Sequence, residues 1–176
     1  ILELEGVTAT RSINADGVDG GSLRVTDSEA ILTSVTFTDP TDVGTRDGGH
    51  VYAFDSTLTI NPGSVFRGGA AARGAAIATD GGILVVDGAT IEDSAPGTAA
   101  LFATSRTSQV SVLSTNFGNN QTHYEISSDA ASRTEVTSCA FNPQDGPVLG
   151  PALYVKSATF VVKNNHFNSG AGVQVS

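Results

Sequence analysis

Residues 152–167 read ALYVKSATFVVKNNHF, and the pattern within them recurs along the whole chain. Its anchors are Val162 and Phe167, which lie five positions apart. Equivalent pairs occur at Leu4/Ala9, Leu32/Phe37, Ile60/Val65, Val86/Ile91, Val112/Phe117 and Val136/Phe141. Successive anchors are separated by 28, 28, 26, 26, 24 and 26 residues. A repeat of this length, with a constant inner gap, predicts a solenoid built from stacked copies of one unit.

Each copy contains three short apolar pieces in which apolar residues alternate with polar ones. This alternation has the period of a strand with one buried face. Three strands of three to five residues cannot bury their faces alone, but stacked copies can, each strand pairing with its counterpart ~4.8 Å away. We therefore expect an all-β fold, a right-handed single-stranded parallel β-helix of about seven coils with three strands per coil. Residues 1–176 are expected to form one domain.

The corners of the expected coils carry turn residues at equivalent positions. Between the second and third strands these are Ser34, Pro62, Gly88, Ser114, Ser138 and Asn164. Glycine-containing pairs such as Gly20-Gly21 and Gly48-Gly49 precede the first strand, where the chain must reverse direction.

Composition limits the classes of partner. The 176 residues carry a net charge of −9, all of it within residues 1–93. A negative surface is repelled by nucleic acid and by anionic membranes, so neither is expected as a partner. No apolar run approaches the length needed for membrane insertion. The single cysteine, Cys139, occupies an inward position and is expected to be a buried thiol.

Both ends of the expected solenoid present open strand edges. The chain starts in mid-repeat at Ile1 and stops as Val173–Val175 begins a new coil. Because solenoids normally cover such edges, we expect a fragment of a longer chain, with the ends covered by further coils or by other protein chains.

Carboxylates gather in the first two long connections, residues 11–22 and 38–50. They are Asp16, Asp19, Asp39, Asp42 and Asp47. Neighbouring corners would bring them together, and oxygen ligands of this kind hold calcium. Their spacing matches no defined calcium loop, so solvated acidic loops are the alternative, and no other cofactor is predicted.

A second row of carboxylates follows the first strands at Asp27 and Asp55, with Asp80 one residue out of register. Either a cation or hydrogen bonding within the turns accounts for stacked like charges, and the turn is the commoner reason. Asn120-Gln121-Thr122 matches the N-glycosylation motif and lies in a short corner connection, which makes Asn120 a candidate glycan site.

The outward positions of the first strands form a ladder that includes three aromatic residues, Tyr52, Phe102 and Tyr154. The remaining positions are Arg24, Ala78, Glu125 and Gln174. Aromatic residues two coils apart would stand ~10 Å from one another. An exposed row of this kind stacks on sugar rings or fills the pockets of a protein partner. The alternative is that the long connections cover the rings, which would then form a satellite core.

Two segment types carry a family resemblance. Gly20-Gly21-Ser22-Leu23 and Gly48-Gly49-His50-Val51, together with Phe117-Gly118-Asn119-Asn120, are similar to degenerate repeats of polymorphic outer-membrane adhesins. The whole chain resembles right-handed β-helix domains of the pectin-lyase-like superfamily. That resemblance implies an extracellular or cell-surface protein with an adhesive or structural role.

The same superfamily includes polysaccharide lyases and glycoside hydrolases. The hydrolases carry Asn-x-Asp, Asp-Asp, Gly-His-Gly and Arg-x-Lys segments, of which only the fragments Glu92-Asp93 and Gly49-His50 occur here. No catalytic residues are therefore predicted. We expect a non-catalytic solenoid that binds protein or glycan through two surfaces. One is the corner that carries the long connections, residues 11–22 and 38–50, called the loop-bearing corner below, and the other is the aromatic ladder. The alternative is a fragment of a polysaccharide lyase or hydrolase.

Overall fold

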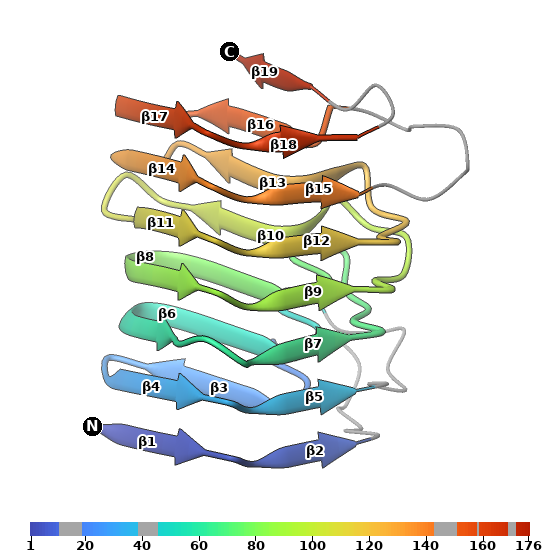
Figure 1. The fold of residues 1–176 in the computed structure, drawn as a ribbon. Coiled ribbons are helices and arrows are strands. Elements are labelled where there is room, and N and C mark those ends of the chain that lie inside the picture. Colours follow the sequence, from blue (N-terminus) through green and yellow to red (C-terminus); the bar gives the residue numbers. More distant parts are fainter. Residues whose placement is uncertain (11–18, 39–45, 143–150, 158, 169–171) are drawn as a thin grey trace.

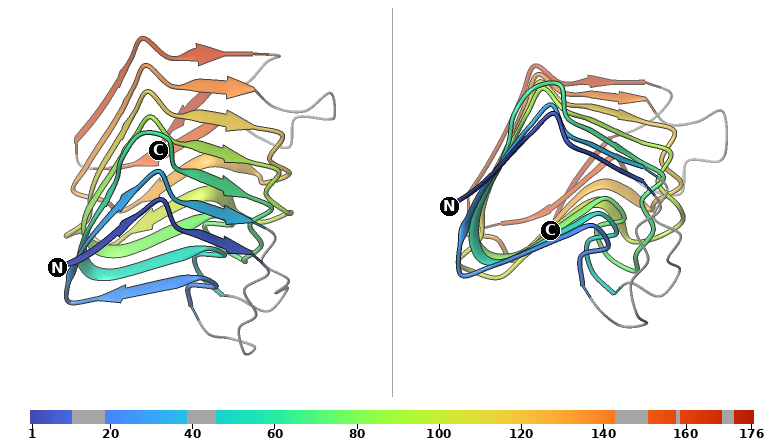
Figure 2. Two further views of the ribbon diagram at one scale, coloured as in Figure 1. Left: turned by 60° about the horizontal axis from the view of Figure 1, so that its bottom comes forward. Right: turned by 90° about the horizontal axis from the view of Figure 1, so that it is seen from below.

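The structure, a computed structural model, describes residues 1–10, 19–38, 46–142, 151–157, 159–168 and 172–176. The described residues form parallel strands stacked in one rod, with β1 (Leu2–Glu5) at one end and β19 (Val173–Val175) at the other (Figure 1). Viewed from the N-terminal end, the chain turns clockwise as it recedes, so the solenoid is right-handed (Figure 2). The predicted all-β parallel β-helix is confirmed. No helix long and apolar enough to cross a membrane occurs among these residues.

Parallel pairing joins the strands into two sheets. The larger sheet has twelve strands: β1 (Leu2–Glu5), β3 (Leu23–Thr26), β4 (Glu29–Thr33), β6 (Val51–Ile60), β8 (Ile77–Asp87), β10 (Ala99–Thr104), β11 (Gln109–Leu113), β13 (Tyr124–Asp129), β14 (Arg133–Thr137), β16 (Leu153–Lys156), β17 (Thr159–Lys163) and β19 (Val173–Val175). The second sheet has seven strands: β2 (Thr8–Thr10), β5 (Thr36–Thr38), β7 (Val65–Arg67), β9 (Thr90–Glu92), β12 (Asn116–Gly118), β15 (Ala140–Asn142) and β18 (His166–Phe167).

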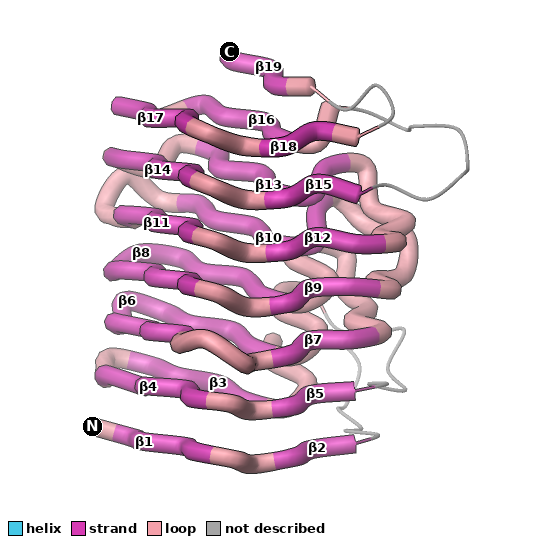
Figure 3. Tube along the Cα trace, in the orientation of Figure 1, coloured by secondary structure: helices cyan, strands magenta, loops and turns pink. Residues whose placement is uncertain are grey.

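The structure differs in one respect from the three separate strands per coil that were predicted. In two coils the first and second strands run into one another as the long strands β6 and β8, which join both walls into the twelve-stranded sheet (Figure 3). The number of complete coils is slightly below seven. The coil of β1 and β2 has no described first strand, and β19 is the first strand of a coil with no described second or third strand.

The repeat anchors lie in one column inside the rod. Residue pairing runs through Leu4, Leu32, Ile60, Val86, Val112, Val136 and Val162, one from each coil. Side chains at the same height in successive coils therefore bury one another. This stacking gives the apolar interior that no single coil could form alone.

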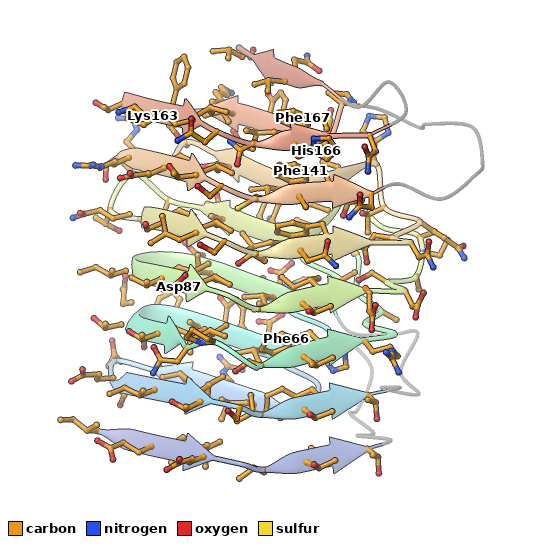
Figure 4. All side chains as sticks on the ribbon, in the orientation of Figure 1. Phe66, Asp87, Phe141, Lys163, His166 and Phe167 are labelled. Atoms are coloured by element: carbon orange, nitrogen blue, oxygen red, sulfur yellow. The ribbon has the colours of Figure 1, made fainter. Side chains whose placement is uncertain are left out.

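A second interior column contains most of the phenylalanines. Phe117, Phe141 and Phe167 pair in register, and their rings stack with centroids 5.2 and 4.9 Å apart (Figure 4). Their planes differ by only 10° and 6° because the strand spacing sets both position and direction. The predicted column of phenylalanines is confirmed for these three coils.

One member of this column was assigned wrongly. Phe66, and not Val65, pairs with Phe37 on one side and Ile91 on the other. The turn from Asn61 to Ser64 is one residue longer than its counterparts, because Pro62 cannot adopt the positive φ that this corner needs. Gly63 adopts it instead, with φ 82°.

The same corner has left-handed backbone in the other coils. Ser34, Gly88, Ser114, Ser138 and Asn164 all have φ between 48° and 61°. These are the positions that the sequence assigned to tight turns.

Cys139 follows Ser138 and is buried, as expected, and burial raises the pKa of its thiol.

Candidate binding face at the loop-bearing corner

The outer face of the first strands lies beside the corner where the third strand of each coil leads into the first strand of the next, which is the loop-bearing corner of the sequence analysis. Figure 2 shows the solenoid in cross-section. Its outward ladder is set by residue pairing and comprises Arg24, Tyr52, Ala78, Phe102, Ser127, Tyr154 and Gln174. The predicted member Glu125 is wrong. Ser128 is polar but faces the interior, where the two neighbouring coils have Ala103 and Val155. The apolar alternation therefore placed this strand two residues too early.

A bulge at the start of β13 turns Glu125 away from the ladder. The N–H groups of Glu125 and Ile126 both donate to the carbonyl of Ala152, at 2.8 and 3.0 Å. The N–H groups of His50 and Val51 share the carbonyl of Ala76 in the same way. Two residues opposite one residue break the alternation of the strand, so the side chain of the extra residue turns inward.

Tyr52 and Phe102 are buried, with exposed fractions of 5% and 6%. They pack with Ala78 and Ala99 in a hydrophobic cluster separate from the main interior. The prediction that these two rings are exposed is therefore wrong. The satellite core, which the sequence left open as the alternative, is what forms.

Glycines in the corner connections allow the backbone to cover this cluster. A Cβ added at Gly20 would lie 3.2 Å from Tyr52 Cβ, and one added at Gly48 would lie 3.0 Å from Tyr52 Cα. A Cβ at Gly74 would approach Ala78 Cβ to 2.8 Å. Only residues without a side chain let the connections pass so close, which is why the rings lose contact with water.

Two guanidinium groups complete the surface over these rings. Arg24 Cζ lies 5.6 Å from the centroid of Tyr52, and Arg73 Cζ lies 5.2 Å from that of Phe102. Both distances are within the range of cation–π attraction. Solvent therefore meets arginine on this part of the face, with the aromatic rings beneath.

The two described members of the predicted calcium cluster bind arginines. Asp47 accepts hydrogen bonds from Arg73 Nε at 2.7 Å and from Arg73 Nη2 at 2.5 Å. Arg46 Nη2 donates to Asp19 Oδ2 at 3.2 Å, and Arg46 Nε lies 3.7 Å from Asp47 Oδ2. Asp19 and Asp47 are buried, and the bidentate pairing of Asp47 with Arg73 compensates the cost of burying that carboxylate.

The remaining members of that cluster, Asp16, Asp39 and Asp42, lie outside the described residues. Within the described part of the chain, no group of three or more His, Cys, Asp and Glu residues is placed to hold a metal ion. Calcium binding by the full set of five stays a prediction. At Asp19 and Asp47, guanidinium groups already supply the positive charge.

The electrostatics of the face keep its tyrosine protonated and its arginine charged. Burial raises the pKa of Tyr52, and the carboxylates of Asp80, Asp19 and Asp47 raise it further. The hydrogen bond from Arg73 to Asp47 raises the pKa of the Arg73 guanidinium. Tyr52 is therefore a neutral phenol at physiological pH.

Tyr154 is the only member of the predicted aromatic ladder that keeps partial exposure. Its ring stacks on Tyr124, with centroids 5.1 Å apart and planes 23° apart. His123 is exposed, and its ring contacts the Tyr124 ring edge-on, with the two ring centroids 4.4 Å apart. The sequence analysis expected Glu125 to face outward, which put its neighbour Tyr124 inside the solenoid, so this pair was missed. The bulge at Glu125, which apolar periodicity does not reveal, turns Tyr124 outward.

The candidate glycan site Asn120 is buried in a polar contact. Its Oδ1 accepts from the N–H of Ser94 at 2.9 Å, and its Nδ2 donates to the carbonyl of Ile91 at 3.1 Å and to Glu125 Oε2 at 2.7 Å. The amide nitrogen that would carry a glycan is thus enclosed and hydrogen-bonded. The folded structure does not offer Asn120 as a glycan acceptor.

The second carboxylate row belongs to turns. Asp27 and Asp55 have φ of 49° and 43°, and Asp80 pairs with Phe54, one residue out of register as predicted. Aspartate tolerates left-handed backbone better than most residues. The turn explanation therefore accounts for this row.

Comparisons of the chain with protein-family models, with curated proteins and with solved structures find no match. The functional inference therefore rests on the fold and on the chemistry of this face. That chemistry consists of stacked rings, guanidinium groups and hydroxyl groups on a rigid sheet, which suits recognition by stacking and hydrogen bonding.

Proposed function

We propose that this chain is a non-catalytic structural or adhesive β-solenoid of an extracellular or cell-surface protein. It binds a protein or glycan through the loop-bearing corner and the outer face of its first strands. The observation that carries this proposal is the Tyr124–Tyr154 stack, partly exposed beside the exposed His123. Tyrosines supply contact area at low entropic cost, and their hydroxyl groups add hydrogen bonds.

The family resemblance supports the cellular setting. The Gly-Gly segments similar to those of outer-membrane adhesins lie at this same corner, where Gly20 and Gly48 have φ of 77° and 65°. The right-handed parallel coil is the architecture of the pectin-lyase-like superfamily that the sequence resembles. We therefore assign the chain to a surface-exposed or secreted role by analogy with those proteins.

The contact surface differs from the one that the sequence indicated. Tyr52 and Phe102 support the face from beneath, while Tyr124, Tyr154 and Arg24 reach its surface. A planar sugar face stacks on the tyrosine pair. Arg24 forms no salt bridge with any other described residue, and its charge is therefore available to a carboxylate or sulfate on the partner.

A glycan array, followed by titration calorimetry with the best ligand, tests this proposal. Tyr154→Ala is expected to weaken binding about five- to tenfold, because stacking on an aromatic ring contributes ~1–1.5 kcal/mol. His166→Ala is the matched control, since His166 is exposed on the seven-stranded sheet. Equal affinity of Tyr154→Ala and the unaltered chain would locate binding elsewhere.

The alternative, a polysaccharide lyase or glycoside hydrolase fragment, predicts a different readout. Incubation with acidic and neutral polysaccharides would release unsaturated or reducing ends if the chain cleaved them. We expect binding without such release. Products that appear with the unaltered chain and disappear with a face variant would replace the adhesive function with an enzymatic one.

A further inference from the structure

The second strands of five successive coils form an outer face that takes no part in the proposed binding function. These strands are β4, the later part of β6, the later part of β8, β11 and β14, which lie one above another (Figure 1). Their outward residues, called the second-strand face below, lie in three columns that residue pairing defines. The first column is Glu29, Thr57, Ile83, Gln109 and Arg133, the second is Ile31, Thr59, Val85, Ser111 and Glu135, and the third includes Asp87, Leu113 and Thr137.

The centre of the second-strand face is apolar. Ile83 is 41% exposed, and the other described large hydrophobic side chains with comparable exposure all lie in the coils at the two ends of the rod. Val85 follows Ile83 on the outward side of β8, and Leu113 lies diagonally beside Val85 on β11; both are partly exposed. Single exposed apolar residues are common on protein surfaces, but neighbouring ones that share a face indicate a contact surface.

Opposite charges lie at equal distances from Ile83 along its column. Glu29 is two coils before Ile83 and Arg133 is two coils after it, so each is ~10 Å from Ile83 by the strand spacing. Glu29 forms no salt bridge with any other described residue. Arg133 binds Glu135 on its own strand at 2.9 Å, but its side chain is 55% exposed and has further donors. A twofold axis through Ile83 therefore brings each of these two charges opposite the other.

We propose that this chain forms a dimer in which two second-strand faces pack against each other about a twofold axis along β8. The two rods run in opposite directions, and Ile83 and Val85 of one copy contact the same residues of the other. Glu29 of each copy faces Arg133 of its partner, which gives two ion pairs that flank the apolar centre. Such a contact uses the same surface on both copies and therefore closes at two. None of the residues that carry it belongs to the first or the last coil.

The charges favour this antiparallel arrangement over a parallel one. Rods that ran in the same direction would be related by an axis along the rod, which reverses the strands and sets the first column against the third. Ile83 would then cover Asp87 of the other copy, and burying that carboxylate without a partner costs free energy. In the antiparallel dimer the two Asp87 side chains face each other at the margin, where β8 ends (Figure 4). Their repulsion weakens the dimer, so its removal tests the arrangement.

The size of the face predicts a weak dimer. Five strands at ~4.8 Å spacing and five residues per strand at ~3.3 Å cover about 24 by 16 Å on each copy. Stable interfaces bury about 800 Å² on each partner, roughly twice that area. We therefore expect a dissociation constant on the order of 100 μM, so that the chain is monomeric in dilute solution and dimeric when concentrated.

Charge exchange in a mixture tests the orientation. In sedimentation equilibrium, Glu29→Arg and Arg133→Glu are each expected to weaken association about tenfold, because both ion pairs become contacts between like charges. An equimolar mixture of the two variants should associate about as tightly as the unaltered chain, since each variant supplies the charge that the other lacks. A loss of folding cannot produce this recovery, and circular dichroism checks the fold of each variant.

Two further substitutions test the centre and the margin of the contact. Ile83→Lys places two like charges on the axis and is expected to weaken association at least about tenfold. Asp87→Asn removes the repulsion between the two carboxylates and is expected to strengthen association about two- to fivefold. A change in one direction at the centre and in the other direction at the margin is specific to this antiparallel contact.

Lys156→Glu is the matched control. It makes the same change of charge as Arg133→Glu, at a side chain that is 56% exposed beside Asp129, but it lies on a first strand, β16. Its association should equal that of the unaltered chain. A chain that stays monomeric at about 1 mM overturns the proposal and leaves the face to another kind of partner. A mixture no tighter than its single variants, or an Ile83→Lys variant that dimerises normally, also overturns it. Tyr154→Ala leaves the dimer unchanged, so the binding function and the dimer can fail separately.

Discussion

The side-chain amide of Asn120 donates a hydrogen bond of 2.7 Å to Glu125 Oε2 inside the loop-bearing corner. Both side chains are more than nine-tenths buried. The hydrogen bond favours the charged carboxylate, but burial has the larger effect and raises the pKa of Glu125 from 4.5 to about 7. A carboxyl group that titrates near neutrality is therefore part of the solenoid wall.

This contact predicts that the folded state becomes less stable as the pH rises toward neutrality. The folded state holds the Glu125 proton more tightly than the unfolded state, so its stabilising effect is complete below pH ~4.5 and is lost as the pH passes through about 7. The loss amounts to about 3 kcal/mol. Glu125→Gln removes the titration and keeps an acceptor for Asn120.

Urea unfolding of both proteins between pH 4 and pH 8.5 measures this effect. The free energy of unfolding of Glu125→Gln should exceed that of the unaltered chain by a difference that grows from near zero at low pH to about 3 kcal/mol above pH 8. The comparison cancels the other titrating groups. Parallel profiles across this range would show that Glu125 ionises normally.

Asn120 is expected to carry no glycan in the folded protein. Its Nδ2 already donates to Ile91 and Glu125, and no space remains for a sugar on that atom. Peptide mass spectrometry of the folded fraction secreted from eukaryotic cells should find Asn120 unmodified. A glycopeptide from that fraction would contradict the enclosed amide.

Phe141 is expected to contribute more to stability than any exposed phenylalanine. It lies between Phe117 and Phe167 in the interior column, so Phe141→Ala leaves a cavity and costs about 3–5 kcal/mol. Phe160→Ala should cost less than about 1 kcal/mol because that side chain is 45% exposed. Similar losses for both would contradict the stacked interior.

Arg73 stabilises the face through its partner and its ring contact. Arg73→Ala leaves the buried carboxylate of Asp47 without its bidentate donor and uncovers Phe102. Because Arg73 is partly exposed, the expected loss is about 1–3 kcal/mol rather than that of a fully buried pair. Arg106→Ala, at an exposed turn, should stay within about 0.5 kcal/mol in the same thermal unfolding experiment.

The left-handed corners predict an unusual response to substitution. Ser114 is exposed and has φ of 48°, a conformation that β-branched residues avoid. Ser114→Val should destabilise the chain by about 1–2 kcal/mol, whereas Ser114→Gly should be neutral or slightly stabilising. The reverse order in chemical denaturation would mean that the corner relaxes to ordinary backbone.

Much of the architecture is predictable because it depends on a local pattern repeated many times. The anchors Leu32, Val112 and Val162 occur at near-constant intervals, and parallel pairing can align equal intervals in only one register. The errors occur where one coil differs in length. Pro62 lengthens one turn, and the bulge at Glu125 displaces the strand that follows.

The candidate face was less predictable, because exposure depends on connections whose path the alternating pattern does not encode. Tyr52 and Tyr154 occupy equivalent outward positions, yet Tyr52 is buried under the glycine-containing connections and Tyr154 is not. Asp47 likewise accepts its hydrogen bond from Arg73, which lies in the next coil, 26 residues along the chain. Neither the burial of Tyr52 nor the pairing of Asp47 with Arg73 corresponds to a motif in the sequence.

Periodicity alone was thus enough to determine the parallel coil, its interior columns and its corner turns, since hydrophobic burial leaves no other arrangement for this repeat. Only the tertiary structure decided which outward side chains meet solvent, which carboxylates pair with arginine, and that Glu125 is enclosed with Asn120. Those outcomes depend on contacts between residues brought together by stacking, and each varies with the length and path of a single connection.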